Sequence, residues 1–335
     1  MIWKNWNKWS SIVVTLALAV SMCFVLPAPE VHAAACTFTS NATGNWNGGI
    51  WTIAGAGCGA YPGQTFAGDT VIIANGTTVT LNVSPANAIA SLQIGQGASG
   101  ILTIGSNTTV RTLNVTGGVT INNGATIIPN NPGAVTAHVL NIGGNFTNNG
   151  TFTSVNGNGS IGVTLNGTTA QAIGGTAVTT FYNMTVNNAA GVGLGINTIV
   201  SNILTLTNGD ISTGANTLEV SATCATGVTG YSANSYVFGN LRLHYPTAGG
   251  TTTCTFPIGD ATTYAPVTVA MVGVTSTLAN SALTAHTDTP DHPDTTAGTS
   301  GIDKNYSVNR YWTLTLQIAR SQFYLIFQSF YKCLI

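Results

Sequence analysis

Short runs that alternate β-branched or aliphatic residues with polar ones recur along most of the chain. Residues 70–73, 78–81, 92–95 and 102–105 are examples, and each run is closed by Asn or Gly. These two residues tolerate the positive φ angles of tight turns, whereas β-branched residues favour strands. No window beyond Ala33 sustains the periodicity of an amphipathic helix. The pattern therefore predicts an all-β protein.

The strand pattern repeats itself at a nearly constant interval. Residues 113–124 return as residues 140–150, so that Leu113 recurs as Leu140 and Gly124 as Gly150, and a weaker echo begins at Leu204. Imperfect repeats of this length predict coils of a β-solenoid, in which each coil stacks its inward side chains on the next. A β-sandwich is the alternative, although regular hairpins every 8–12 residues would be more typical of it. The expected inward ladder is Val115, Ile121, Ile142, Phe152, Leu165, Val186, Leu206 and Val220.

Residues 1–33 have the layout of a secretory signal. Lys4 and Lys8 precede an apolar stretch at positions 11–26, and residues 31–33 (Val-His-Ala) supply a cleavage site. The apolar stretch is shorter than the ~20 residues that span a bilayer. We therefore expect cleavage and export to the cell surface or medium, with no stable membrane span afterwards. A membrane anchor and a lipoprotein modified at Cys36 are the alternatives.

Export makes the remaining cysteines informative, because disulfides form in oxidising compartments. Four cysteines allow three connectivities. Local pairing is favoured because each couple lies within one compositional segment, and four buried free thiols are the alternative. No CxxC occurs and no His lies at zinc-ligand spacing, which argues against a zinc site. The expected disulfides are Cys36 with Cys58 and Cys224 with Cys254.

Ionisable side chains are scarce. Between Ala34 and Val220 the formally charged residues are Asp69, Arg111, Asp210 and Glu219. Over residues 34–315 there are four basic against eight acidic residues, a net charge of −4 with His neutral. Binding to nucleic acid requires a basic patch that displaces counterions, and the chain has none. The same shortage argues against binding to anionic lipid.

Three candidate sites lie in the cap and the repeats, and each has a structural interpretation. Residues 95–100 match a dinucleotide-binding fingerprint in glycine spacing, but a strand follows them rather than a helix, which predicts a turn. Asp210 and Glu219 are too far apart in sequence to be expected to converge as the carboxylates of a polysaccharide hydrolase or lyase. Trp46 and Trp51 could stack on sugars, but a plug for the open first coil is favoured. The repeats therefore predict no catalytic residue.

An acidic loop is the remaining candidate for a metal site. Oxygen-rich loops can hold Ca²⁺, but the spacing matches no calcium-binding loop that we can identify. A solvated loop is therefore favoured, with calcium left as an alternative, and we expect no metal and no cofactor. The loop contains Asp288, Asp291, Asp294 and Asp303, with His286 and His292 between them.

The region from Cys36 to Val220 resembles two kinds of extracellular protein. Trp46, Pro62-Gly63, residues 68–73 and residues 92–94 are similar to the opening of a glycine-rich extracellular domain named for its eight glycines. The chain also resembles bacterial surface proteins of the β-strand-repeat, right-handed β-helix type, whose rungs are similar to residues 145–152 and 181–188. The resemblance implies a secreted or surface-displayed adhesive or structural protein, and it transfers no catalytic residue.

The pattern changes near Thr223, where longer alternating strands begin. Residues 307–314 resemble the arginine–tyrosine–tryptophan strand of a sandwich module that follows β-repeats in bacterial surface proteins, and the strands expected after it are missing. Residues 316–335 contain no Gly, Asn, Asp or Thr and hold five aromatic residues. A frameshifted or truncated end is the favoured explanation, and an amphipathic tail is the alternative.

The chain is thus expected to divide into five segments. These are a signal peptide (1–33), a loop-rich cap (34–68), a right-handed parallel β-helix (69–222), an incomplete β-sandwich-like module (223–315) and an aberrant tail (316–335). The expected function is that of a non-enzymatic, exported adhesive or structural protein at the cell surface, with surface glycans or other surface proteins as partners. The alternatives are a carbohydrate-binding or polysaccharide-degrading β-helix and, third, a binder of ice or crystal surfaces.

Overall fold

The described part of the chain consists of strands and turns, which confirms the all-β prediction. The computed structural model describes residues 35–246, 250–272, 281–290, 309–318 and 324–328. Every regular element within these ranges is a strand, and a search of the same ranges finds no helix that could cross a membrane. The predicted signal peptide lies outside the described residues.

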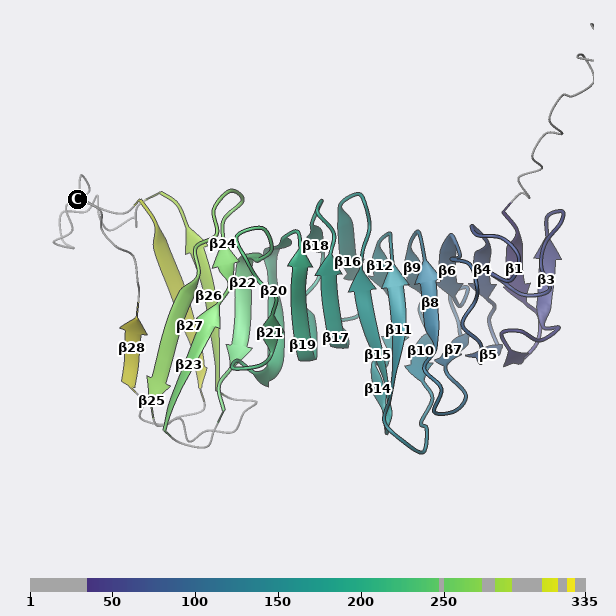
Figure 1. Ribbon diagram of the computed structural model, residues 1–335, viewed down its shortest axis with the longest axis horizontal. Helices are drawn as coiled ribbons and strands as arrows, with labels where there is room; N and C mark the ends of the chain where they lie inside the picture. Colours follow the sequence, from purple (N-terminus) through teal and green to yellow (C-terminus); the bar gives the residue numbers. More distant parts are fainter. Residues whose placement is uncertain (1–34, 247–249, 273–280, 291–308, 319–323, 329–335) are drawn as a thin grey trace, which may run out of the picture. The chain divides into compact units, whose positions relative to one another are not determined.

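Parallel strands stack as a β-solenoid of about eight turns, which confirms the solenoid prediction (Figure 1). One ladder, called here the first ladder, runs along the whole stack, with Val71 beside Leu92 and Leu92 beside Val119. Its strands are β1 (Thr37–Ser40), β4 (Thr70–Ile73), β6 (Ser91–Ile94), β9 (Val119–Ile121), β12 (Phe146–Asn148), β16 (Gln171–Gly175), β18 (Val192–Leu194), β20 (Ile211–Thr223), β22 (Val237–His244) and β24 (Ile258–Gly259).

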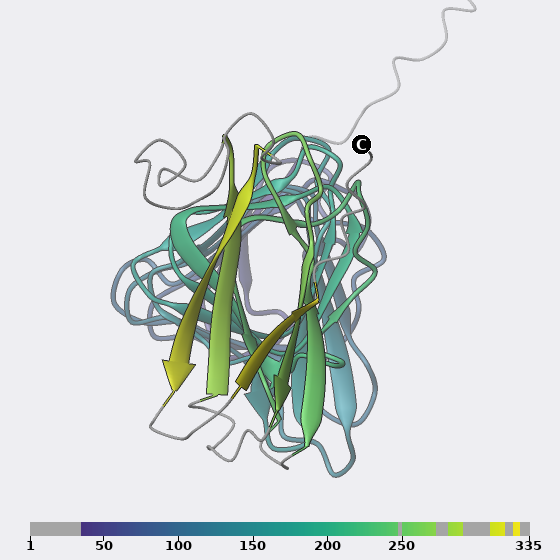
Figure 2. The same ribbon diagram turned by 90° about the vertical axis from the view of Figure 1, so that its left-hand side faces the viewer.

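Two further parallel ladders complete the sides of the coils, which superpose in the view along the stack (Figure 2). The second ladder contains β2 (Gly44–Asn45), β5 (Thr78–Leu81), β7 (Ile101–Ile104), β10 (Thr126–Pro129) and β13 (Thr151–Phe152). The third contains β8 (Thr112–Val115), β11 (Thr136–Ile142), β15 (Gly159–Leu165), β17 (Thr179–Asn187), β19 (Thr198–Asn208) and β21 (Val228–Thr229). A very short strand, β14 (Val155–Asn156), pairs antiparallel with β15.

The core is a continuous column of apolar side chains inside these coils. Because side chains alternate between the two faces of a strand, every second residue points inward. Leu113 lies beside Leu140 in the ladder, as the sequence repeat predicts. All eight residues of the expected inward ladder are buried, with exposed fractions between 0% and 7%: Val115, Ile121, Ile142, Phe152, Leu165, Val186, Leu206 and Val220.

Side-chain amides join neighbouring coils at the turns. The Asn75 Oδ1 accepts hydrogen bonds from the backbone N–H groups of Gln96, Ala98 and Ser99 at 2.8, 3.4 and 3.2 Å. These residues belong to the glycine-rich segment 95–100, which connects β6 to β7 with Gly97 at a φ of 107°. The segment is therefore a turn between two strands, as predicted, and the N–H groups of Gln96, Ala98 and Ser99 are bonded to the preceding coil.

The first coil is closed by the two tryptophans. Trp46 is fully buried and Trp51, on β3 (Trp51–Ala54), is 7% exposed. Their rings meet edge to face at 5.4 Å, and β3 folds antiparallel onto β1. The Trp51 Nε1 donates to the Trp46 carbonyl oxygen at 2.7 Å. The rings are consequently buried as a plug, as expected, and they are not exposed platforms for sugars.

The carboxylate of Asp69 fastens the cap to the first coils. Asp69 is 4% exposed and accepts hydrogen bonds from Cys36 N at 3.2 Å and Gly63 N at 2.8 Å. Cys36 is in turn bonded to Cys58, with a Cα–Cα distance of 5.9 Å, which confirms the first predicted disulfide. Two distant backbone donors thus depend on one side chain.

Replacing Asp69 with alanine is expected to lower the free energy of unfolding by about 2–3 kcal/mol, because two buried N–H groups lose their acceptor. Asp69→Asn keeps one acceptor oxygen, so its loss should be smaller. Urea unfolding followed by tryptophan fluorescence, to which Trp46 and Trp51 of the cap contribute, measures the loss. Wild-type stability in both variants would contradict the assigned role.

The parallel pairing continues past residue 222, the end expected for the β-helix. β20 pairs with β22 through Leu218–Leu241, and β22 pairs with β24 through Val237–Ile258. After this point the pairing becomes antiparallel. β26 (Ser281–Asp288) joins β22 and β27 (Tyr311–Ile318) joins β26, while a separate sheet contains β23 (Thr251–Phe256), β25 (Val267–Val272) and β28 (Tyr324–Gln328).

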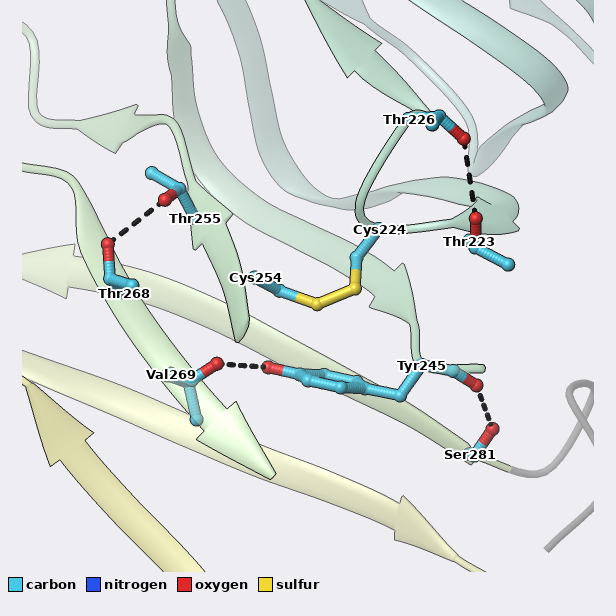
Figure 3. Close-up of a disulfide and its surroundings, with 9 residues drawn as sticks. All are labelled: Thr223, Cys224, Thr226, Tyr245, Cys254, Thr255, Thr268, Val269 and Ser281. Carbon is cyan, nitrogen blue, oxygen red and sulfur yellow. Dashed lines mark hydrogen bonds between the residues drawn. A yellow bond between two sulfur atoms is a disulfide. The ribbon is translucent and has the colours of Figure 1, made fainter. Parts of the chain in front are cut away.

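The second predicted disulfide connects the solenoid to this separate sheet. Cys224 directly follows β20 and is bonded to Cys254 in β23, with a Cα–Cα distance of 5.5 Å. Beside it, the buried Tyr245 side chain donates from its hydroxyl to the Val269 carbonyl oxygen in β25 at 3.3 Å (Figure 3). The pairing Cys224–Cys254 is thus confirmed, and it lies at the junction of two sheets.

Part of the segment predicted to be aberrant takes part in this architecture. Residues 324–328 form β28, which pairs antiparallel with β25 from Thr268 to Val272. β27, which contains the tyrosine and tryptophan of the predicted sandwich strand, pairs along its whole length with β26. The frameshift hypothesis concerns the gene and stays a prediction.

Candidate functional site

A groove crosses the outer face of the first ladder in its later coils. It has a volume of about 760 Å³ and receives residues from successive coils, among them Ala190, Gly193, Asp210, Ser212 and Asn234. The outward positions of the ladder here are small: Ala172 lies beside Gly193, and Gly193 beside Ser212. Because no large side chain stands above the sheet here, the groove runs across it beside the turns that precede β16, β18, β20 and β22. This groove is the candidate functional site.

The next outward position of the same ladder carries an aromatic ring. Phe238 lies beside Ser212 on one side and Gly259 on the other, and it is 37% exposed. It lines a second depression of about 350 Å³ together with Asp260 and Asp288. Ala261 and Thr262 line both depressions, so the two adjoin at this turn.

The polar floor of the groove is held by Asp210 and Tyr236. The Tyr236 N–H donates to the Asp210 Oδ1 at 3.1 Å, and the Tyr236 hydroxyl donates to the Asp260 carbonyl oxygen at 2.8 Å. Partial burial raises the pKa of the Asp210 carboxyl, and the hydrogen bonds from Tyr236 oppose that shift. Burial also raises the pKa of the Tyr236 phenol, with the nearby carboxylates adding to the effect. Asp210 is therefore built into the groove wall.

The charge of Asp260 is balanced by Arg310, which directly precedes β27. Its carboxylate forms an ion pair with the Arg310 guanidinium and accepts hydrogen bonds from the N–H groups of Thr262 and Thr263 at 2.8 Å. Desolvation alone would raise the pKa of Asp260, but these hydrogen bonds hold it at about 2. The ion pair fixes the turn that separates the two depressions.

Glu219 lies in a different place from Asp210. It lines its own depression of about 230 Å³ with Arg242, and its Oε2 is 3.2 Å from Arg242 Nη1. The Oε1 is 3.0 Å from the Nε2 of His244, which is 4% exposed. The hydrogen bond from His244 and the charge of Arg242 hold the pKa of Glu219 below its usual value despite partial burial. The structure therefore does not bring the two carboxylates of the repeats together.

The acidic loop can be followed only in part. His286 Nε2 lies 2.8 Å from Asp288 Oδ2 on β26, whereas Asp291, His292, Asp294 and Asp303 lie outside the described residues. Among the residues that are described, no three His, Cys, Asp or Glu side chains are grouped so that they could hold a metal ion. The calcium alternative for this loop stays an untested prediction.

The fully buried His138 was not anticipated from the sequence. Its Nδ1 accepts a hydrogen bond from the Arg111 N–H at 3.0 Å, so the proton of the neutral ring is on Nε2, which lies 2.8 Å from Asn130 Oδ1. Burial lowers the pKa of His138, and the Arg111 charge lowers it further. The ring therefore acts as a neutral link between coils.

His138 is expected to make folding sensitive to mild acid. Since its pKa is lower in the folded chain than the ordinary 6.5, the unfolded chain binds this proton more readily below about pH 6.5. The stabilisation is thus complete above pH 6.5 and decreases as the pH falls toward the lowered pKa. Urea unfolding from about pH 7.5 to about pH 5 should show a shallower decline in His138→Gln, although that variant starts from a lower stability. Parallel declines would contradict this assignment.

No family model matches the chain, and no curated protein and no solved structure matches it. The likeness to β-strand-repeat surface proteins therefore rests on the residues quoted for it, and the groove has to be interpreted from its own chemistry.

Proposed function

We propose that the chain is an exported, non-enzymatic structural and adhesive protein of the cell surface, similar in kind to bacterial β-strand-repeat proteins. The observation that supports this most directly is the continuous first ladder, which runs from β1 to β24. Each coil is hydrogen-bonded to its neighbours through backbone and Asn side chains, such as Asn141 to Asn114 at 2.8 Å. Such a stack gives a stiff scaffold with a polar, weakly charged exterior.

The hydrogen bonds and ion pairs of the carboxylates support the function of a scaffold rather than that of a hydrolase. Asp69 binds two backbone N–H groups, Glu219 is paired with Arg242 and His244, and Asp260 is paired with Arg310. Hydrolysis of a glycosidic bond requires two carboxyl groups on either side of one sugar linkage. Asp210 and Glu219 line separate depressions, so neither has the other as a partner.

Both disulfides support the export part of the proposal. Cys36–Cys58 and Cys224–Cys254 each close a local loop, with sequence separations of 22 and 30. Stable disulfides are characteristic of secreted proteins and rare in the cytosol. We accordingly propose that the exported chain is located at the cell surface.

Adhesion can be tested by displaying the exported chain on a non-adherent bacterial host. We expect several-fold more cells to be retained under flow on at least one of glass, polysaccharide-coated or host-cell surfaces than for a host displaying Leu165→Asp. Retention no greater than that control on every surface would contradict the proposal.

The polysaccharide-degrading alternative is separated from adhesion by a second assay. Purified protein would be incubated with soluble polysaccharides, and reducing ends would be counted. Product release that is lost in Asp210→Asn or Glu219→Gln would overturn the non-enzymatic assignment, and its absence in all three proteins would support it.

A further inference from the structure

The groove has a direction and a length that suit an extended chain molecule. It crosses the strands, because its lining comes from the turns of consecutive coils, from residue 170 through Asp210 and Asn234 to Thr262. Neighbouring strands in a ladder are about 4.8 Å apart, so five coil positions extend over roughly 19 Å. The groove is therefore long enough for several units of a polymer that lies along the stack.

Two amides in the groove are free to bind something else. The side-chain amides of Asn75, at a turn, and Asn183, within β17, form hydrogen bonds with the neighbouring coil. Asn208 and Asn234 are exposed in the groove, and their side-chain amides make no hydrogen bond within the described part of the chain. Their coils are adjacent, since the Gly209 N–H donates to the Asn234 carbonyl oxygen at 3.1 Å. An amide both donates and accepts, which matches a row of sugar hydroxyls.

The charge and the shape of the groove limit which class of ligand fits it. Among the described residues, the ionisable side chains that line the groove are Asp210 and Tyr236 and none is basic, so these residues offer a polyanion no counter-charge. The floor is the face of the sheet, whereas a peptide strand adds to a sheet edge. The surface is concave, unlike the flat face that a crystal would require. The exposed ring of Phe238 supplies an apolar platform in the adjoining depression.

The geometry points to this groove, together with the adjoining depression that Phe238 lines, as a binding site for an extended neutral polysaccharide. The hydroxyls of the polymer bond to Asn208, Asn234 and Asp210, and the apolar face of one sugar ring packs on Phe238. Gly193 and Ser212 leave room for the chain above the sheet. This inference rests on the proposed adhesive function, since it names the class of ligand through which adhesion occurs.

Two glycines provide a matched pair of variants. A Cβ at Gly193 would have the Gln171 carbonyl oxygen as its nearest neighbour at 3.9 Å, and a Cβ at Gly174 would meet nothing within 4 Å. Neither glycine has a positive φ. Both lie at outward positions of the first ladder, but only Gly193 lines the groove. Gly193→Tyr should therefore fill the groove, and Gly174→Tyr should leave it open.

Affinity electrophoresis in native gels tests the inference with defined probes, namely dextran, laminarin, glucomannan and neutral xylan, with polygalacturonate as the anionic probe. We expect at least one neutral polymer to retard the wild-type chain. Gly193→Tyr should weaken that retardation at least about tenfold, Phe238→Ala about five- to tenfold, and Gly174→Tyr should not change it. The double variant Asn208→Ala/Asn234→Ala should also bind more weakly.

The result that would overturn the inference is no retardation by any neutral polymer, retardation by polygalacturonate alone, or equal effects of the two tyrosine variants. Far-UV circular dichroism of each variant shows whether it is folded. Because the gel assay needs no cell surface, polysaccharide binding without adhesion under flow would contradict the proposed function and leave the groove assignment standing. Adhesion that persists in Gly193→Tyr would instead place the adhesive surface elsewhere and contradict this inference.

Discussion

Leu165→Asp is expected to unfold the coils around β15. Leu165 is fully buried in the third ladder, between Ile142 of the preceding coil and Val186 of the next. A carboxylate at this position has no partner for its charge, and the apolar contacts of leucine are lost as well. The free energy of unfolding should fall by about 3–5 kcal/mol. Urea unfolding and limited proteolysis would measure the loss.

Thr153→Asp is the matched control. Thr153 directly follows β13 and, unlike the buried Phe152, is only half-buried. A charge there reaches water, so we expect a change within about 0.5 kcal/mol. Because each coil contacts only its neighbours, cleavage in Leu165→Asp should begin in the coils adjoining β15. Equal tolerance of both substitutions would show that the assigned register is wrong.

The register of these coils could be predicted from the sequence where two local signals agreed, namely the alternation of apolar and polar residues and the sequence repeat. Alternation with a period of two decides which side chains face inward, and a shift by one position would invert them all. The sequence repeat aligned Leu113 with Leu140, and the structure places them side by side. The later coils lose this signal because their lengths vary. Val192 and Ile211, which are neighbours in the first ladder, are closer in sequence than Phe146 and Ile173, which are neighbours in an earlier coil.

Bends within continuous strands were a second obstacle to predicting the coils. β17 and β19 each continue through a bend, and their pairing shifts in register between Phe181 and Asn183. One continuous strand therefore serves two sides of a coil. β20 behaves in the same way, since its pairing with β22 shifts in register between Ser212 and Thr217. Without a turn to mark this coil, the expected β-helix ended at residue 222, whereas the parallel pairing goes on to β24.

The candidate groove was not predicted, because it depends on the lateral alignment of coils with unequal lengths. Asp210 stood out as a rare carboxylate, but nothing in the sequence places Gly193, Ser212 and Phe238 in one outward row. His138 had no signal either, since a buried neutral histidine differs from a solvated one only in its partners. The groove and the neutral state of His138 both depend on contacts between residues of different coils.

Removing the Cys224–Cys254 disulfide is expected to loosen one sheet and spare the solenoid. The bond ties the residue after β20 to β23, which pairs antiparallel with β25 and not with the coils. Removing a disulfide that closes a loop of this size lowers the free energy of unfolding by about 3–4 kcal/mol, because the unfolded chain gains conformational freedom. In Cys224→Ser/Cys254→Ser, amide hydrogen exchange should therefore rise in β23 and β25, while peptides from β6 to β12 stay protected.

Cys36→Ser/Cys58→Ser is the matched comparison. This bond fastens the cap beside Gly55, which follows β3, where the terminal coil has a neighbour on one side only. Faster exchange should appear in β1 and β3 and leave β23 and β25 unchanged. The two variants would then loosen opposite ends of the stack, as expected if stability is the sum of local coil contacts. Exchange that rises uniformly along the chain in either variant would show instead that the solenoid and the later sheets unfold as one cooperative unit.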